Sequence, residues 1–262
     1  MNVFILTDLE GIAGVNDIEY MDRASEKYKI ACAHLCHSIN VAAEACLKAG
    51  AENVYYLDGH GGGGNADPAQ IVTYVQKCTI EDWQKLLASG AIDCQVEIGC
   101  HARAGTINGF LDHTLSSKTV FCHKINDVEM SELALHAALC GKYGVPVVAC
   151  TGDEIACLQA KSYIPTLCTG VVKYARCRNE AATVENADDI LFRAVYDGVK
   201  DYRNATLFHV AEPAVVEVTY YRTDMCEAVY QRVRDNENVT RVDARTLRKA
   251  VAAFIDYFDL RI

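Results

Sequence analysis

The sequence predicts an α/β fold in which an open, largely parallel sheet is flanked by helices, with a smaller α+β part at the C-terminal end. Three observations support this prediction. Short apolar runs alternate with stretches of helical periodicity, which is typical of right-handed βαβ crossovers. The apolar runs are nearly continuous, as in buried parallel strands. The alternation weakens after residue 164, so we expect one domain at 1–164 and a second at 165–262.

Five strands are predicted in the first part of the chain, each as a short apolar run that ends at charge or at a turn. In chain order they are residues 3–7, 53–57, 94–98, 119–123 and 147–150. The first helix is predicted at 24–48, where apolar residues recur every three or four positions. A second helix is expected to begin at Asp67 and Pro68, an N-cap followed by proline. A third is predicted at 128–140.

The C-terminal part shows a different pattern. Residues 187–202 are predicted as a helix, and residues 214–221 as an exposed or antiparallel strand. A further helix is expected at 243–257, where alanine, leucine, arginine and lysine are frequent. These elements form the smaller α+β part of the prediction.

The net charge of −10 excludes some classes of partner. Acidic residues are spread along the chain, so the protein repels the phosphate backbone of nucleic acids and an anionic membrane surface. The N-terminus lacks the basic segment of a signal peptide, and we find no run of about 20 apolar residues. We therefore expect an enzyme of the cytoplasm, without a nucleic-acid or membrane partner.

Cysteine is frequent, with 13 residues in the chain. Most lie inside apolar runs, and no CxxC pair occurs, so neither a zinc knuckle nor a thioredoxin-like site is predicted. Cysteine used in this way packs as a small apolar side chain in a reducing compartment. We expect all the thiols to be reduced and none to be catalytic.

Three of the predicted strands end in residues that can bind a metal ion. The first is followed by Asp8 and Glu10, the second by His60 and the third by His101. Residues two apart on an extended segment point the same way, so both carboxylates can face one pocket. The carboxyl ends of parallel strands border the crevice where open sheets bind ligands. One such residue alone is more often a cap or a structural histidine, but together they predict a metal site.

Imidazole and carboxylate ligands without thiolate favour zinc over manganese or iron. Five protein ligands suit two ions that share a carboxylate, and such a pair can hold a bridging hydroxide and polarise a carbonyl or phosphoryl oxygen. Glu132, near the start of a predicted helix, is the candidate for the fifth ligand. Its alternative role is to complement the helix dipole.

Two other histidines have weaker claims. His136 lies one helical turn after Glu132 beside leucines, so we expect it to pack in the core rather than bind metal. His113 lies in a loop after Asp112. It is either an exposed turn residue or a group that folds over the metals and moves protons.

A second interpretation concerns the run from Gly61 to Gly64. A glycine-rich loop between a strand and a helix can hold a phosphate on its backbone N–H groups. The run matches neither of the established phosphate-binding patterns, so we favour a loop that lies close to the metals.

The segments that carry these residues resemble the di-zinc D-aminopeptidase family. They occur in the family's order over roughly the first 160 residues and are highly specific as a set. The matching segments are Thr7-Asp8-Leu9-Glu10-Gly11, Leu57-Asp58-Gly59-His60, Gly99-Cys100-His101-Ala102-Arg103, Leu111-Asp112-His113-Thr114 and Ser131-Glu132-Leu133.

This resemblance implies that Asp8, Glu10, His60, His101 and Glu132 bind two zinc ions per subunit, with Asp8 bridging them. It also implies that His113 is the active-site histidine, for which we favour a proton-transfer role because an activated hydroxide is already a competent nucleophile. Family members form stacked rings, so a homodecamer that admits only short peptides is expected.

The expected activity is zinc-dependent aminopeptidase hydrolysis of the N-terminal peptide bond of short peptides, with a small D-residue such as D-alanine first. One alternative is a di-metal phosphoesterase or amidase that uses the loop from Gly61 to Gly64. Another is a protein that binds metal or peptide without turnover.

Overall fold

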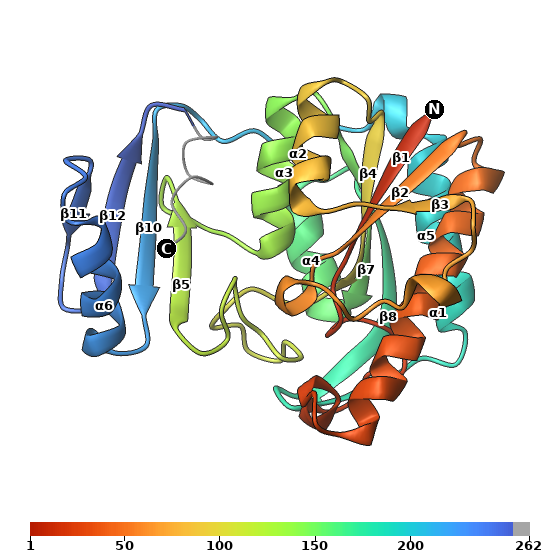
Figure 1. Ribbon diagram of the computed structural model, residues 1–262, viewed down its shortest axis with the longest axis horizontal. Helices are drawn as coiled ribbons and strands as arrows, with labels where there is room; N and C mark the ends of the chain where they lie inside the picture. Colours follow the sequence, from red (N-terminus) through yellow and green to blue (C-terminus); the bar gives the residue numbers. More distant parts are fainter. Residues whose placement is uncertain (254–262) are drawn as a thin grey trace.

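The computed structural model describes residues 1–253, which form two sheets with helices around them (Figure 1). Within these residues the larger sheet has seven strands in the order β3-β2-β1-β4-β7-β8-β9. All neighbours pair in parallel except β8 and β9, which are antiparallel. Its strands are β1 (Asn2–Thr7), β2 (Asn53–Asp58), β3 (Val75–Lys77), β4 (Cys94–Cys100), β7 (Val147–Asp153), β8 (Cys168–Cys177) and β9 (Glu180–Thr183).

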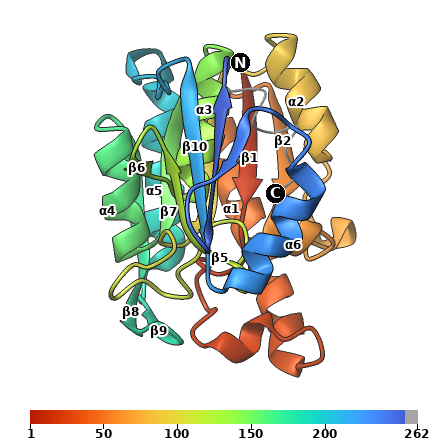
Figure 2. The same cartoon turned by 90° about the vertical axis from the view of Figure 1, so that its left-hand side faces the viewer.

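The smaller sheet is antiparallel and has the order β11-β12-β10-β5-β6. Its strands are β5 (Val120–Ile125), β6 (Val128–Glu129), β10 (Ala214–Tyr220), β11 (Val239–Arg241) and β12 (Thr246–Val251). Helix α6 (Thr223–Val233) packs on β10 and β12 and faces the viewer in Figure 2.

Helices cover both faces of the larger sheet. One face carries α1 (Glu26–Lys48) and α5 (Ala187–Lys200), which also pack against each other. The other face carries α2 (Ile80–Ala88), α3 (Glu132–Lys142) and α4 (Glu154–Tyr163), and its apolar core continues onto the smaller sheet. Both faces of the central strands are thus buried, which explains why β4 and β7 are buried along their whole lengths.

Helix α1 is long and apolar enough to cross a membrane by length and composition, although the sequence showed no uninterrupted apolar run of that length. Half of the apolar window is buried inside the protein. Its buried side contacts α5 and the strands of the larger sheet. A core helix passes the same test of length and composition.

The structure confirms the predicted α/β class and most of the predicted elements, with three adjustments in the first part. The strand expected at 119–123 forms as β5, but it belongs to the antiparallel sheet rather than the parallel one. Asp67 caps a turn as expected by accepting a hydrogen bond from Ala69 N, yet the turn ends after Pro68–Gln70. The helix expected from residue 128 begins at Glu132 because β6 precedes it.

The helix expected at 243–257 is wrong for the residues that the structure describes. Thr246–Val251 is strand β12, which pairs with β10 on one side and β11 on the other. Its buried side chains alternate with exposed ones, and this pairing outweighs the helix propensity of the individual residues. Residues 254–257 lie outside the described part of the chain.

Each sheet draws strands from both sides of residue 164. The smaller sheet includes β5 and β6 from before it, whereas β8 and β9 from after it complete the larger sheet. The division of the chain at residue 164 therefore stays a prediction about domains and does not describe how the sheets are built.

Candidate metal centre

The predicted ligands gather at one edge of the larger sheet. Strand β1 lies between β2 and β4, and the three are parallel, so their carboxyl ends meet there. The chain builds β2 and β3 on one side of β1 and then returns to build β4 on the other. This change of direction is the place where open α/β sheets form their binding crevice.

Two glycines allow the segments after β1 and β4 to touch. A Cβ on Gly99 would lie 2.1 Å from the Asp8 carbonyl oxygen, and one on Gly11 would lie 2.1 Å from the Cys100 carbonyl oxygen. Gly99 also has φ +78°, a left-handed conformation that favours glycine. The Gly11 N–H donates to the Gly99 carbonyl at 2.8 Å. This close backbone contact places the carboxylates of the first segment beside His101.

Asp8, Glu10 and His60 form the first group of potential ligands, whose donor atoms all lie within 4.8 Å of one another. His60 Nδ1 is 3.1 Å from Asp8 Oδ1 and 2.9 Å from Glu10 Oε2. The group therefore combines two carboxylates and one imidazole, a donor set that suits zinc.

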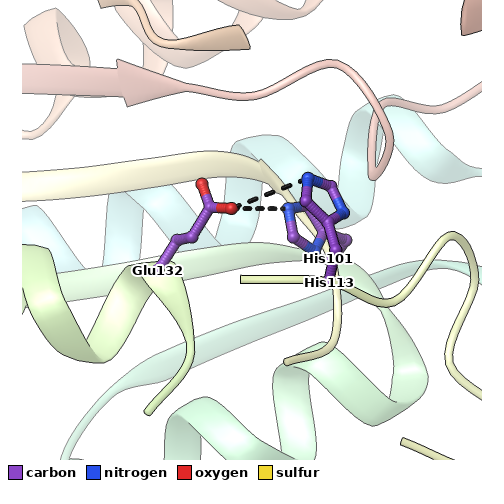
Figure 3. Close-up of side chains that lie close together, drawn as sticks. All are labelled: His101, His113 and Glu132. Carbon is purple, nitrogen blue, oxygen red and sulfur yellow. Dashed lines mark ion pairs between the residues drawn. The ribbon is translucent and has the colours of Figure 1, made fainter. Parts of the chain in front are cut away.

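His101, His113 and Glu132 form the second group, again with donor atoms within 4.8 Å. His101 Nε2 lies 3.5 Å and His113 Nε2 3.6 Å from the same oxygen of Glu132, Oε1 (Figure 3). The two imidazole rings are stacked, with centroids 3.9 Å apart. Glu132 is the first residue of α3, so the backbone dipole of the helix also lies at this place.

Asp8 connects the two groups. Its Oδ1 faces His60 in the first group, and its Oδ2 lies 3.1 Å from His101 Nε2 in the second. A carboxylate with one oxygen toward each of two ligand groups has the geometry of a bridging ligand between two metal ions. All five predicted ligands are therefore together, and His113 lies with them.

The side chains stabilise positive charge at this position. Burial raises the pKa of Asp8, but His101 and His60 outweigh it and hold the pKa well below its usual range. Burial also raises the pKa of Glu132, but His101 outweighs this effect and lowers the pKa to about 2. Burial lowers the pKa of His60, yet its two carboxylate neighbours raise it to about 11. A divalent cation held by these residues would supply the positive charge that the carboxylates stabilise.

The histidines are oriented as metal ligands are. His101 Nδ1 lies 2.9 Å from the Ala102 carbonyl and His113 Nδ1 lies 2.8 Å from the Leu111 carbonyl. These carbonyls fix the proton on Nδ1 and leave the Nε2 lone pair for a ligand. His101 Nε2 is buried and, among the described residues, meets no acceptor in hydrogen-bond geometry, although the Asp8 and Glu132 carboxylates lie 3.1 Å and 3.5 Å away. This atom and the mixed nitrogen and oxygen donor set fit bound zinc.

The glycine run serves the loop that carries His60. Gly61, Gly62, Gly63 and Gly64 all have positive φ, between +56° and +87°. Buried Asp58 at the end of β2 holds the far side of the loop by accepting hydrogen bonds from the backbone N–H groups of residues 65 and 66. The loop has positive φ at four consecutive positions, a conformation that glycine adopts readily, and this explains the four glycines.

A buried lysine supports the loop after β1. Lys173 of β8 is fully buried, and its Nζ donates to the backbone carbonyl of Glu10 at 2.8 Å and to that of Val15. It also lies 4.9 Å from the centroid of the Phe110 ring. Burial lowers the pKa of Lys173 to about 7. The lysine fixes the backbone from which the Glu10 carboxylate reaches the site.

The site opens into a pocket of about 530 Å³. Trp83, Ile80 and Leu57 line it as apolar walls, and Glu97 and His136 line it as polar groups. His136 Nδ1 lies 3.2 Å from Glu97 Oε2, and its ring packs edge-on against Trp83. His136 therefore packs against a core residue as expected, and it also faces the pocket, which the sequence did not indicate.

Sequence reasoning missed Glu97 and Lys173. Both are charged residues that lie among buried apolar neighbours in their strands, and both are almost completely buried. A charge in the middle of a buried strand must be paired or hydrogen-bonded, because an isolated buried charge is strongly unfavourable. That signal is present in the amino-acid sequences of β4 and β8.

The chain is similar to known proteins in both sequence and fold. The family model described as D-aminopeptidase matches residues 1–260. The D-aminopeptidase of Bacillus subtilis strain 168 is 26% identical over 182 residues, which are 68% of this chain and 66% of that protein. The chain thus matches just under two thirds of the length of this relative.

One solved structure shares the fold over nearly the whole chain. It is that of the zinc-dependent D-aminopeptidase DppA from Bacillus subtilis, described as a self-compartmentalizing protease. The TM-score is 0.90 at 19% sequence identity, and the match covers 99% of this chain and 94% of that one. At this identity the likeness establishes the fold.

Proposed function

Because the chain belongs to the D-aminopeptidase family, we propose that it is a zinc-dependent aminopeptidase that removes a small N-terminal D-residue, such as D-alanine, from short peptides. The observation that carries this proposal is the position of Asp8. Each of its carboxylate oxygens faces one of the two ligand groups, as expected for a site that holds two metal ions.

In this proposal Asp8, Glu10 and His60 hold one zinc ion, and His101 and Glu132 hold the other together with Asp8. Two zinc ions would polarise the carbonyl of the scissile bond and lower the pKa of a water molecule. The protein holds the ligands in place through the short backbone contact between Gly11 and Gly99 and through Lys173.

His113 is the proposed proton donor to the leaving amine. Its Nε2 lies 3.9 Å from Glu10 Oε1 and 3.6 Å from Glu132 Oε1, and so faces both ligand groups. It comes from a loop rather than from the end of a strand. An imidazole on a loop beside the reacting bond is suited to moving a proton near neutral pH.

The proposal extends to assembly and location. The structural neighbour is a self-compartmentalizing protease, which supports a homo-oligomer, and we propose a homodecamer that admits short peptides. All 13 cysteines are free, and this supports the reducing environment of the cytoplasm.

A substrate panel tests the proposed activity. We expect hydrolysis of D-aminoacyl p-nitroanilides with a small side chain, little hydrolysis of the L-forms, and loss of activity with a chelator that zinc restores. Turnover of p-nitrophenyl phosphate instead would favour a phosphoesterase that uses the loop from Gly61 to Gly64. Failure to turn over either class, with zinc bound, would indicate a binding protein.

A further inference from the structure

The wall of the pocket carries one lysine among its acidic residues and histidines. Among the described residues that line it, Lys118 is the one lysine or arginine, whereas Asp8, Glu10, Glu97 and Glu132 are acidic. Lys118 is exposed, and its side chain makes no ion pair or hydrogen bond with the other residues of 1–253. A cation that no protein group neutralises at the wall of a binding pocket is available to an anionic group of a ligand.

The segment that carries Lys118 is tied to the ligand site. The backbone N–H of Leu115 donates to Glu132 Oε1 at 2.8 Å, and Leu115 has φ +64°, unusual for a leucine. Thr114 Oγ1 donates to the Met130 carbonyl at 3.1 Å. Thr119 closes the turn by bonding Ser116 Oγ at 2.7 Å. The loop formed by residues 114–119 is therefore fixed relative to the proposed zinc ligand Glu132.

The loop lines the pocket beside His113. His113, the proposed proton donor to the leaving amine, is followed directly by residue 114 and the loop. Leu115, Ser116 and Ser117 line the pocket together with Lys118. With the scissile nitrogen at His113, the residue released by the reaction would lie on the side of the pocket that this loop lines.

We propose that Lys118 binds the free C-terminal carboxylate of the substrate, so that the preferred substrates are dipeptides. This inference rests on the proposed aminopeptidase function. In a dipeptide the carboxyl carbon lies only about 2.5 Å from the scissile nitrogen, since two bonds separate them. Each additional residue moves the carboxylate outward by roughly 3.3–3.6 Å and away from the loop.

The test compares a dipeptide with a free carboxylate, D-alanyl-D-alanine, with its C-terminal amide. For the zinc-loaded wild type we expect a lower KM for the free acid, and roughly a fivefold rise of that KM in Lys118→Ala with little change in kcat. The KM for the amide should not change. Lys118→Arg keeps a cation and should retain the difference between the two substrates.

Lys85→Ala is the matched control. Lys85 is an exposed residue of α2, a helix that borders the pocket, but its own side chain does not line the pocket. This variant removes the same charge and should leave both KM values unchanged. If Lys118→Ala changes both substrates equally, or neither, Lys118 does not bind the carboxylate. If the wild type cleaves neither substrate, the aminopeptidase proposal and this inference are both overturned.

Discussion

His113 differs from the five proposed ligands because it neither comes soon after a strand of the larger sheet nor begins a helix, yet its Nε2 is as close to Glu132 as that of His101. We expect His113→Ala to keep both zinc ions while kcat falls about 10²–10⁴-fold, the usual contribution of a general acid or base. His60→Ala and His101→Ala should lose zinc together with activity, because each removes a proposed ligand. Zinc stoichiometry and steady-state kinetics on the three variants measure the difference.

Zinc stoichiometry and kinetics measured on the same variants also show whether this assignment of His113 is wrong. If His113→Ala loses zinc as the ligand variants do, then His113 is a metal ligand and the second group in the structure is a complete ligand set. If it keeps nearly full kcat, the histidine has no catalytic role. His136→Ala provides a comparison inside the same pocket, since this residue lies outside both ligand groups.

A different prediction concerns Tyr56 of β2, whose buried hydroxyl has no hydrogen-bond partner among the described residues. Removing an unpaired buried hydroxyl relieves a desolvation cost, so Tyr56→Phe should stabilise the protein by up to about 1 kcal/mol. In contrast, the Tyr28 hydroxyl donates to Asn65 Oδ1, and Tyr28→Phe should be destabilising by about 1 kcal/mol. Denaturant unfolding of both variants at neutral pH tests the pair.

The burial of Tyr56 also predicts how the stability of the protein changes with pH. Burial raises the pKa of Tyr56 from 10.0 to about 12. Between these values the unfolded chain loses the phenolic proton while the folded protein keeps it, so the stability of the wild type falls as pH rises. Phenylalanine has no proton to lose, so the free energy of unfolding of Tyr56→Phe does not fall for this reason. The difference in stability between Tyr56→Phe and the wild type should therefore increase above pH 10. An advantage that stays constant or shrinks would contradict the assignment.

The residues at the site were predictable to different degrees for physical reasons. Asp8, His60 and His101 follow recognisable strands, and parallel strands bring their carboxyl ends together whatever the details of packing. Glu132 required the resemblance, since its distance from His101 depends on how α3 docks on the sheet. Lys118 could not be predicted from sequence, because an exposed lysine in a loop carries no periodic signal.

At the scale of secondary structure, the site depends on how closely the ends of β1 and β4 approach. Gly99→Ala would put a Cβ 2.1 Å from the Asp8 carbonyl oxygen and force these segments apart. We expect this variant to lose stability by several times the effect of Gly90→Ala and to bind zinc poorly. Gly90 has a similar φ of +69° but open space around its Cβ position, so it isolates the backbone effect, about 1 kcal/mol.

Thermal unfolding and zinc titration of the two glycine variants provide the measurement. Equal losses of stability would show that backbone conformation alone matters and that the close contact does not. If Gly99→Ala loses stability but binds zinc with normal affinity, the contact matters for the fold but not for the position of the ligands. Either result would contradict the conclusion that the contact between the strand ends positions the ligands.

Local pattern predicted the elements of the larger sheet better than those of the smaller one. The buried parallel strands β1, β4 and β7 are short, mostly apolar segments that end at a turn or at polar residues. Strand β12 contains residues that favour helices, and its extended form depends on pairing with β10, some thirty residues earlier. Strand β5 was recognised, but nothing local indicates which of two sheets a strand will join.

For the whole molecule, the proposed ligands connect segments from distant parts of the chain. They follow β1, β2 and β4 and begin α3, whose other contacts reach the core shared with the smaller sheet. A ligand that binds the folded state alone stabilises it by RT ln(1 + [L]/Kd), which is about 2.7 kcal/mol at 100 times Kd. Zinc should therefore raise Tm of the entire protein in one cooperative transition.

Elemental analysis combined with calorimetry tests this last prediction. We expect about two zinc ions per chain, and a Tm that falls on chelation and recovers when zinc is restored. His60→Ala and His101→Ala should show a smaller shift of Tm with zinc, since each lacks one ligand. One zinc per chain would remove the bridging role of Asp8, although both of its oxygens face histidines. Full activity without any transition metal would exclude the metallopeptidase mechanism, because Asp8, Glu10 and Glu132 would then have no ion to hold.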